Sequence, residues 1–599
     1  MSKAIAIKSV VEAWLAAFDR ALAARDPRAA AALFGDECFW RDIVSFTWNV
    51  KTLEGRGDIV AMLSANLEAI SPTGWRIKEE PTIANGVIEA WIRFDTKVAR
   101  GRGVLRLKDG SAWTLLTAID ELKGFEERKG ERRPRGIQHG IYRRGKTWLE
   151  EKQADEAGLG FTVQPYCVIV GGGQGGIALG ARLKQLEVPT IILEKNTMPG
   201  DSWRNRYRSL VLHDPVWCDH LPYIPFPENW PIFTPKDKLG DWLEMYVKVM
   251  ELNYWTSSEC TRAGFDERSR TWTVEVSRKG QRVILQPKHL VFATGAYGPP
   301  REIALPGIER FVGEHYHSSR YSTGEGYEGK HCVVVGGNSS AHDIAADLWE
   351  FGATVTMLQR SPTTVVKSET LMQYAFEPLY SESAVEAGIT TEKADLTFAA
   401  TPFRIMHLAQ IPIYSEIRRR DSSFYDRLQR SGFRWDFGDD DSGLMMKALR
   451  TGSGYYIDVG ASELIANGSI AVKSGVEIRE VTETTVKLTD GTILVADLIV
   501  MATGYQSMNR AVATIISEET ADKVGKCWGL GSNTRGDPGP WEGEPRNMWK
   551  PTQQPGLWFH GGNLHLSRHY SQFLALQLKA RMEGLATPVY GLQPVHHKS

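Results

Sequence analysis

Cysteine is scarce in this chain of 599 residues. There are only six cysteines, and no two of them stand in a CxxC pair. The chain therefore lacks the close pair of thiols on which dithiol–disulfide reductases depend. Histidine, cysteine and acidic residues also show no grouping with the spacing of a metal site, so we expect no bound metal.

Long apolar runs and an excess of one charge are missing as well. No run is long enough to span a bilayer, and the first residues lack the basic-then-apolar pattern of a secretory signal. The 71 basic and 72 acidic residues give a formal net charge of -1. Such a balance does not favour nucleic acid or an anionic membrane as a partner. We expect a cytoplasmic protein, and a homodimer stays open.

Glycine, by contrast, is concentrated in a turn that follows a short apolar strand at residues 167–170. Gly171, Gly173 and Gly176 give the spacing GxGxxG, which allows a tight turn, close approach of the backbone to a pyrophosphate, and packing of the next helix. The following strand ends at Glu194, where a carboxylate can bind ribose hydroxyls. The same site would include Gln174, Gly175 and Lys195.

A second copy of this turn follows residues 332–335. It keeps Gly336 but places Asn338 at the middle glycine, and asparagine tolerates a left-handed backbone. Its next strand ends in Arg360 rather than an acid. Because arginine can pair with a 2′-phosphate that a carboxylate would repel, we predict FAD at the first turn and NADPH at the second. A solvated charge at a strand end is the alternative for Arg360. Ser339 and Ser340 belong to the same predicted site.

Two further strands end in Ala-Thr-Gly, at residues 291–295 and 500–504. A hairpin signal, Asp490-Gly491, precedes the second of them. We predict an α/β protein with two Rossmann-like dinucleotide-binding lobes, in which one nucleotide passes a hydride to the other. These strand ends add Thr294, Gly295, Thr503 and Gly504 to the predicted cofactor contacts.

The segment between the two units narrows the family. Residues 311–321 match FxGxxxHxxxY, which resembles the signature of class B flavin monooxygenases. The pattern ends in Tyr321 rather than tryptophan, as in the flavin-containing branch rather than the Baeyer–Villiger branch. Residues 212–215 and 221–227 look closest to YUCCA-type members. Residues 200–207 resemble the family's segment beside the flavin.

This resemblance implies roles for individual residues. Gly200 and Trp203 would lie beside the flavin, and Asn563 would belong to the strand that closes its site. His213 stands where many animal-type members carry an asparagine thought to support the oxygenated flavin. We take His213 and Trp203 as candidate catalytic residues, with a structural histidine as the alternative for His213. YUCCA-type members have a lysine where this chain has Val216. Ser318 and Ser319 would lie near NADPH.

The implied reaction is a monooxygenation. NADPH reduces FAD, O2 adds at flavin C4a, and the resulting hydroperoxide inserts one oxygen atom into a small organic substrate. The resemblance suggests a soft nitrogen or sulfur nucleophile, as in N,N-dimethylaniline monooxygenases, or a 2-oxo acid. A Baeyer–Villiger oxygenase, an uncoupled NADPH oxidase and a flavin-bearing scaffold with a ligand-binding cone remain alternatives.

Residues 1–125 belong to a different module. An apolar helical face, a helix start at Asp26-Pro27, and hairpin signals at residues 85–86 and 109–110 predict helices and a curved antiparallel sheet. With residues 39–42, this order resembles the α+β cone of NTF2/SnoaL-like domains. Asp42 is then either an acid or base in the cone's pocket or a structural residue that binds backbone.

The predicted division of the chain follows from these units. A linker or adaptor, with a helix near Trp148, would join the N-terminal module to the two lobes. The second lobe would carry a helical insertion, which forms a substrate wall, a lid or part of the core. The predicted boundaries are 1–125 for the NTF2/SnoaL-like domain, 126–160 for the linker, 161–310 for the FAD lobe, 311–505 for the NADPH lobe with its insertion at about 361–454, and 506–599 for the return to the FAD lobe.

Overall fold

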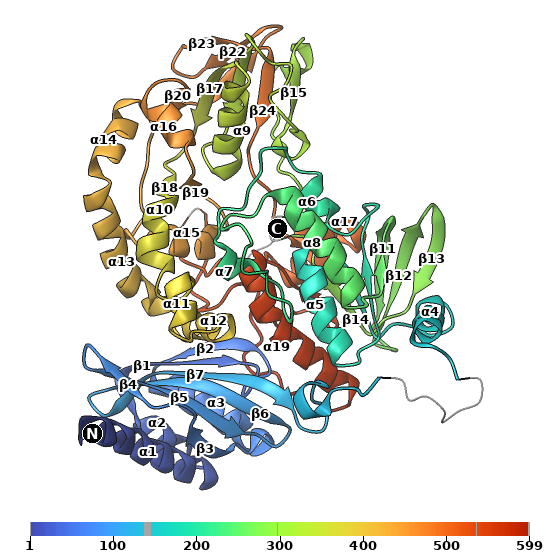
Figure 1. Ribbon diagram of the computed structural model, residues 1–599, viewed down its shortest axis with the longest axis vertical. Helices are drawn as coiled ribbons and strands as arrows, with labels where there is room; N and C mark the ends of the chain where they lie inside the picture. The colour runs from blue at the N-terminus through green and yellow to red at the C-terminus, as the bar shows by residue number, and fades with distance from the viewer. Residues whose placement is uncertain (1, 137–144, 296–297, 535, 597–599) are drawn as a thin grey trace.

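The computed structural model describes residues 2–136, 145–295, 298–534 and 536–596. Figure 1 shows an N-terminal unit at one end of the molecule and two α/β lobes beyond it. Helix α19 (Leu564–Met582) runs between the N-terminal sheet and the first lobe. The chain is therefore a mixed α/β protein in which the C-terminal helix lies against its N-terminal unit.

The N-terminal unit is a sheet with the strand order β2-β1-β7-β6-β5-β3, with β4 paired to β5. The predicted apolar face of α1 is buried, and the Asp26 carboxylate accepts hydrogen bonds from the first backbone N–H groups of α2. The bounds are α1 Ser2–Ala23, α2 Pro27–Ala32, β1 Phe34–Ile43, β2 Val50–Glu54, α3 Gly55–Ile70, β3 Thr73–Ile77, β4 Thr82–Ala84, β5 Val87–Asp95, β6 Ala99–Lys108 and β7 Ser111–Leu122.

Two of the predicted hairpins form in this sheet. Asn85-Gly86 joins β4 to β5 and Asp109-Gly110 joins β6 to β7, with positive φ at all four residues. The sheet is antiparallel, as expected, except that β1 pairs with β7 in parallel. The chain passes through α3 and five strands before β7 pairs with β1, so no short turn forces the pair to be antiparallel.

The first lobe is built on a parallel sheet with the order β10-β9-β8-β14-β25. All the residues of β8, β9 and β14 are buried, as expected of apolar strands covered on both faces. The bounds are β8 Cys167–Val170, α5 Gln174–Gln185, β9 Thr190–Leu193, α6 Asp201–Arg204, α7 Val216–Asp219, α8 Lys236–Val249, β10 Tyr254–Trp255, β11 Ser258–Asp266, β12 Thr271–Arg278, β13 Gln281–Leu285, β14 His289–Phe292 and β25 Leu557–Phe559.

The second lobe repeats the plan with the parallel order β15-β24-β16-β17-β20. Figure 1 shows helix α9 beside these strands. The bounds are β15 Glu314–His317, η3 Ser318–Arg320, β16 His331–Val335, α9 Ser339–Glu350, β17 Thr354–Gln359, α16 Ala461–Ala466, β20 Ala471–Ser474, β21 Ile478–Val481, β22 Thr485–Leu488, β23 Ile493–Val495 and β24 Leu498–Met501.

Helices follow β17 where the strand–helix alternation of the sequence stops. The segment from β18 (Thr364–Lys367) to β19 (Tyr455–Asp458) contains π-helix η4 (Met372–Phe376) and several α-helices. Phe403, Met406 and Tyr414 on α13 are buried, whereas Leu408 is exposed. This helix therefore packs as core. The α-helices are α10 Ser368–Leu371, α11 Glu382–Glu386, α12 Thr391–Ala399, α13 Phe403–Arg420, α14 Ser422–Arg430 and α15 Gly443–Thr451.

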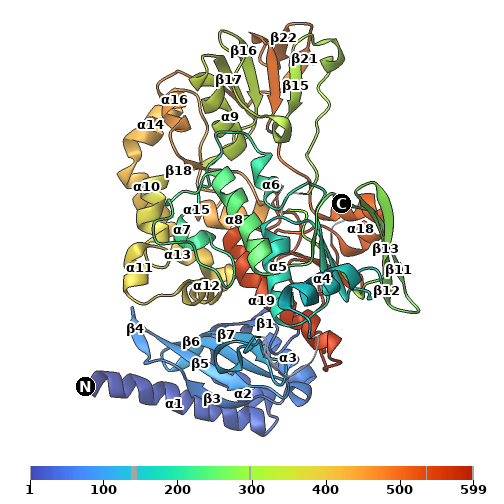
Figure 2. The ribbon, with the colours of Figure 1, turned by 45° about the vertical axis from the view of Figure 1, so that its right-hand side comes forward.

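The outer elements complete the shape. Figure 2 shows α4 (Trp148–Gly158), the helix expected near Trp148, and α18 (Glu518–Val524) on the side of the first lobe that carries β11–β13.

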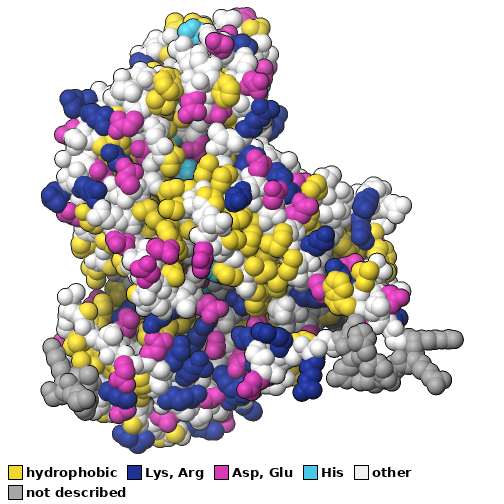
Figure 3. All heavy atoms as spheres, in the orientation of Figure 1, with side chains coloured by type: hydrophobic (Ala, Val, Ile, Leu, Met, Phe, Trp, Pro, Cys, Tyr) yellow, Lys and Arg dark blue, Asp and Glu magenta, His cyan; other side chains and the backbone are white. Residues whose placement is uncertain are grey.

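Figure 3 shows hydrophobic side chains across the middle of one face and charges of both signs on the N-terminal unit. Among the described residues, no helix has the length and apolar character of a membrane span.

Candidate functional site

A cavity of about 800 Å³ opens at the carboxyl ends of β8, β9 and β14 and at the N-terminus of α5. In parallel α/β sheets, ligands bind at this edge of the strands. Most residues predicted for the first dinucleotide site meet here. Those that line the cavity are Gly171, Gly173, Gln174, Gly175, Glu194, Lys195, Trp203, Thr294, Gly295 and Asn563.

The glycines of the first turn are required for different reasons. A Cβ on Gly171 would lie 2.4 Å from the Ala293 carbonyl oxygen, and one on Gly176 would lie 2.0 Å from the Gly171 carbonyl oxygen. These two glycines are required by the protein's own packing. A Cβ on Gly173 would have Ser202 Oγ as its nearest neighbour, at 3.6 Å. The space beside Gly173 therefore belongs to the cavity, which suits a pyrophosphate at the N-terminus of α5.

Glu194 is held firmly at the end of β9. One carboxylate oxygen accepts the Gly172 N–H at 3.0 Å, and the other accepts the Asn196 N–H at 2.8 Å. The Tyr254 hydroxyl also donates to the Gly172 carbonyl oxygen, at 2.7 Å. The carboxylate lines the cavity in a fixed orientation, which fits the binding of ribose hydroxyls.

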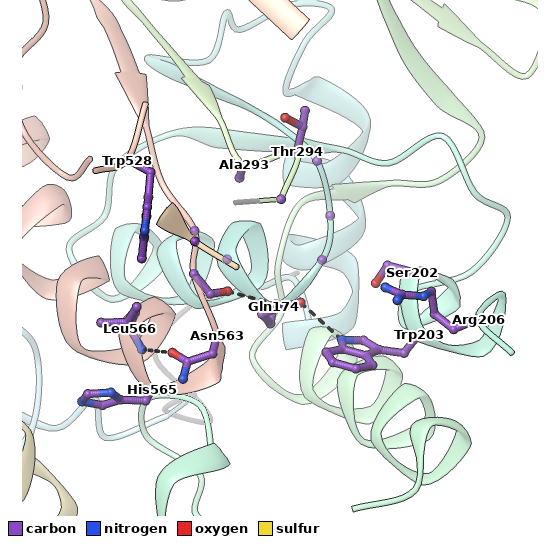
Figure 4. A pocket seen from close by; sticks show the side chains of 18 of the residues that line it. Gln174, Ser202, Trp203, Arg206, Ala293, Thr294, Trp528, Asn563, His565 and Leu566 are labelled. Carbon is purple, nitrogen blue, oxygen red and sulfur yellow. Dashed lines mark hydrogen bonds between the residues drawn. The ribbon is translucent and has the colours of Figure 1, made fainter. Parts of the chain in front are cut away.

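Gln174 joins the two sides of the cavity. Its side-chain oxygen accepts a hydrogen bond from Trp203 Nε1 at 3.2 Å, and its amide donates to the Gly562 carbonyl oxygen. Figure 4 shows Trp203 and Arg206 on one side of Gln174, and Asn563 and Trp528 on the other. The open space beside Gly173 and the fixed carboxylate of Glu194 fit FAD.

Gly200 supports this site without lining the cavity. Its φ is +89°, and an added Cβ would lie 2.2 Å from the Gly240 carbonyl oxygen. Glycine therefore allows the start of α6 to approach α8 closely, which positions Trp203 on α6.

His213 is not part of the cavity lining. Its Nε2 lies 3.7 Å from an Asp343 carboxylate oxygen, and its ring contacts Tyr456 edge-on. Burial raises the pKa of Asp343, while His213 and a hydrogen bond from Tyr207 oppose that rise. The histidine thus belongs to a polar cluster between the lobes, and its predicted role beside the flavin stays a prediction.

The second turn lies in the second lobe, apart from this cavity. Gly336 has φ +150°, and a Cβ there would lie 2.5 Å from the Ala502 carbonyl oxygen, so the glycine is structural. Asn338 has φ −104°. The reason given for an asparagine here, a left-handed backbone, is therefore wrong. The side chain of Asn338 makes no capping hydrogen bond to α9, and the Ser339 hydroxyl donates to the Tyr455 carbonyl oxygen.

The strand end that carries Arg360 has a second polar residue that the sequence reasoning passed over. Gln359 is buried and hydrogen-bonds to Thr363, whose hydroxyl donates to the Gly337 carbonyl oxygen. Gln359 thus supports the second turn, much as Glu194 supports the first. Arg360 is exposed, which leaves its guanidinium accessible to a phosphate.

The remaining predicted contacts of the second site lie around His317. Its ring contacts Ser319 Oγ at 3.0 Å and the Gly504 carbonyl oxygen at 2.9 Å, so it links η3 to the end of β24. Ser318 is buried, and Thr503 donates to the Arg301 carbonyl oxygen. Ser340 lies in the first turn of α9. These residues surround the carboxyl ends of β16 and β24, where we expect NADPH.

The other half of the cavity is largely apolar and comes from segments without a recognised motif. Phe398 on α12, Leu449 on α15 and Trp528 are among its walls. The predicted insertion thus contributes both core, through α13, and cavity wall, through α12 and α15.

One polar corner interrupts this apolar half. His565, in the first turn of α19, and Tyr380 line the cavity, and both contact Asp395 on α12. Asp395 is bound in turn by Arg568. No motif marks this cluster, because Asp395 and His565 are 170 positions apart and come together only through packing of α12 on α19. The only local signal is an excess of polar residues in the first turns of α19.

Comparison with known proteins finds relatives of the part of the chain that follows the N-terminal unit. A family model described as "Pyridine nucleotide-disulphide oxidoreductase" matches residues 168–421. The probable indole-3-pyruvate monooxygenase YUCCA10 of Arabidopsis thaliana is 30% identical over 343 residues, which cover 57% of this chain and 81% of that protein. The indole-3-pyruvate monooxygenase YUCCA1 of Oryza sativa subsp. japonica is 30% identical over 345 residues, covering 57% of this chain and 77% of that protein.

A solved structure extends the likeness to the fold. An open crystal structure of cyclohexanone monooxygenase aligns with a TM-score of 0.50 and 19% identity, over 70% of this chain and 88% of the other. The family model begins at residue 168, after the N-terminal unit.

Proposed function

This chain belongs to the class B flavin monooxygenases and is an NADPH-dependent enzyme that uses FAD. We propose that it inserts one oxygen atom from O2 into a small organic molecule held in the apolar half of the cavity. The candidates are a soft nitrogen or sulfur nucleophile, as in N,N-dimethylaniline monooxygenases, and a 2-oxo acid, as the names of the YUCCA relatives suggest.

The observation that carries this proposal is the continuity of the cavity. The same space is lined by the first dinucleotide turn and by apolar side chains such as Phe398 and Trp528. FAD bound there, once reduced by NADPH, supplies the activation of O2. The chain's own residues bind and orient the cofactor through the first turn and Glu194, and the apolar walls exclude bulk water from the reacting centre.

Product analysis under ¹⁸O2 tests this proposal. Protein loaded with FAD and given NADPH should transfer one labelled oxygen atom to an acceptor such as a thioether, in proportion to the NADPH consumed. Consumption of NADPH that yields only hydrogen peroxide with every acceptor would favour the oxidase alternative.

We propose that residues 1–125 form an NTF2/SnoaL-like domain with a structural role. The order of helices and strands supports this, and the interior is filled with aromatic rings such as Trp40 and Phe46. Asp42 accepts hydrogen bonds from Ser45, Thr47 and Thr117, so its carboxylate is occupied within the fold. For the whole protein, we also propose a cytoplasmic location and assembly as a homodimer.

Removal of residues 1–149 tests the structural role. The domain binds α12 and α19, which carry cavity residues, so the shortened protein should lose solubility or activity. A soluble fragment 150–599 with the activity of the full chain would contradict the role.

A further inference from the structure

We propose that His565 is a further catalytic residue, a base that removes a proton from a cationic amine substrate before oxygen transfer. The inference rests on the proposed monooxygenase function and adds a residue and a substrate class to it. It depends on the geometry of one corner of the cavity, where His565 and Tyr380 meet buried charges behind the wall.

The hydrogen bonds fix which nitrogen of His565 carries a proton. The Tyr380 hydroxyl donates its single proton to Asp395 Oδ1 at 2.9 Å. His565 Nε2 lies 3.1 Å from the same hydroxyl oxygen and 3.2 Å from Asp395 Oδ1. Both neighbours accept from Nε2, so Nε2 is the protonated nitrogen. In the neutral ring, Nδ1 then holds a free lone pair, and none of the described residues forms a hydrogen bond with it.

Asp395 is prepared to stabilise a protonated His565. It receives two hydrogen bonds from Arg568, at 2.9 and 2.8 Å, and its side chain is 3% exposed. Burial alone would raise the pKa of Asp395, but Arg568 and His565 outweigh burial and hold that pKa well below its ordinary value. The carboxylate is therefore ionised, and it orients the imidazole as an aspartate does in a His–Asp pair of a hydrolase.

Two other titratable side chains near His565, Asp219 and His569, are weaker candidates for the base. Burial and the neighbouring Asp214 raise the pKa of Asp219 well above its usual value, so Asp219 stays protonated. Burial also lowers the pKa of His569 well below its usual value, so that ring stays neutral. The titratable and charged groups that face the corner are Asp395, Arg568, His569, Tyr380, Cys218, Asp219, His220 and Asp214.

The side chains that line the apolar half of the cavity favour the binding of a cationic substrate. Asp214 contributes a carboxylate, held by the Asn563 amide at 2.9 Å. Aromatic rings of Phe376, Phe398 and Trp528 stand around the same space, and such faces attract cations. The lysine and arginine among the described residues that line the cavity are Lys195 and Arg206, both from the first dinucleotide side. Figure 4 shows Arg206 beside Trp203, on the opposite side of the cavity from His565.

An ammonium group needs such a base. Protonated nitrogen has no lone pair to accept an oxygen atom. Transfer of one N–H proton from substrate to His565 Nδ1 leaves the electron pair on nitrogen and makes the amine nucleophilic. The positive charge moves to the imidazole beside Asp395. The overall monooxygenation converts O2, NADPH and the ammonium to the oxygenated amine, NADP⁺ and water, so the removed proton is consumed and no further reductant is needed.

A matched pair of probes tests the inference. N-Benzylmethylamine and benzyl methyl sulfide have similar shapes, but only the amine carries a removable proton at neutral pH. In His565→Ala, we expect kcat/KM for the amine to fall about 100-fold at pH 7, the lower range for loss of a general base. The sulfide should be oxidised at the wild-type rate, and the amine reaction should recover as pH rises and free amine accumulates. His331→Ala, an exposed histidine on β16, should match wild type with both probes.

The sulfide rate and the content of bound FAD report whether the variant is folded. Equal losses with amine and sulfide, or no loss with the amine, would overturn the base role. If His565→Ala does not retain FAD, the more conservative variant Tyr380→Phe is measured instead. Loss of this hydroxyl should slow the reaction of the amine and leave that of the sulfide unchanged. A wild-type protein that oxidises NADPH but oxygenates neither probe would contradict the proposed function itself, and the base role with it.

Discussion

Arg41 of the N-terminal unit and Glu544 of the C-terminal segment form an ion pair inside the protein, 503 positions apart in the chain. Arg41 Nε lies 2.7 Å from Glu544 Oε1, and the two side chains are 0% and 1% exposed. The same guanidinium donates to the Ala399 carbonyl oxygen at the end of α12 and to the Tyr570 hydroxyl on α19. One arginine therefore ties the N-terminal unit to both helices that carry the polar corner of the cavity.

Loss of Arg41 should destabilise the whole protein. Arg41→Met leaves the Glu544 carboxylate buried and without its cation, which typically costs about 3–5 kcal/mol. Unfolding monitored by tryptophan fluorescence should show this loss. Arg41→Met/Glu544→Gln should recover part of it, and Arg419→Met, at an exposed ion pair on α13, should leave stability unchanged. Equal stability of Arg41→Met and wild type would mean that the two parts are not coupled.

The first turn should determine binding of FAD. Gly173→Val places a branched side chain in the space that we assign to the pyrophosphate, although the protein itself leaves room for it. The purified variant should therefore be folded but colourless, as flavin absorbance and circular dichroism can show. Gly264→Val, at a strand position with open space around it, is the control and should stay yellow. A yellow Gly173→Val protein would place FAD elsewhere.

Arg360 should determine the preference for the phosphorylated nicotinamide. Since only NADPH carries the 2′-phosphate, Arg360→Ala should raise the KM for NADPH about tenfold and leave the KM for NADH unchanged, as expected for one charge-assisted hydrogen bond. Steady-state kinetics with both cofactors measure this. Arg479→Ala, an exposed arginine on β21 of the same lobe, should change neither value. Equal effects of Arg360→Ala on the two KM values would remove Arg360 from the site.

The parts of the fold that follow local rules are predictable from sequence. Gly171 and Gly176 are glycines because their own backbone neighbours leave no room for a Cβ, and this requirement appears directly as GxGxxG. The hairpin at Asp109-Gly110 depends on positive φ at two adjacent residues, which is equally visible in sequence. Such features need no knowledge of distant segments.

The features that sequence reasoning missed depend on distant packing. His213, a candidate for the flavin because of its place in a family motif, lies beside Asp343 through packing of the two lobes, and its role at the flavin stays a prediction. His565 enters the cavity because α19 packs on α12, and nothing near it in the sequence marks Asp395 as its partner. The parallel pairing of β1 with β7 is likewise set by the course of a long intervening segment rather than by a turn.

Rapid mixing with oxygen shows whether this cavity holds a flavin that activates O2. The FAD-loaded protein, reduced with NADPH in the absence of oxygen, is mixed with oxygenated buffer while its absorbance is followed. We expect a transient with near-ultraviolet absorbance distinct from both reduced and oxidised flavin, which decays faster when a substrate that accepts the oxygen atom is present. Direct return to oxidised flavin, with one hydrogen peroxide released per NADPH and no effect of substrate, would contradict this expectation.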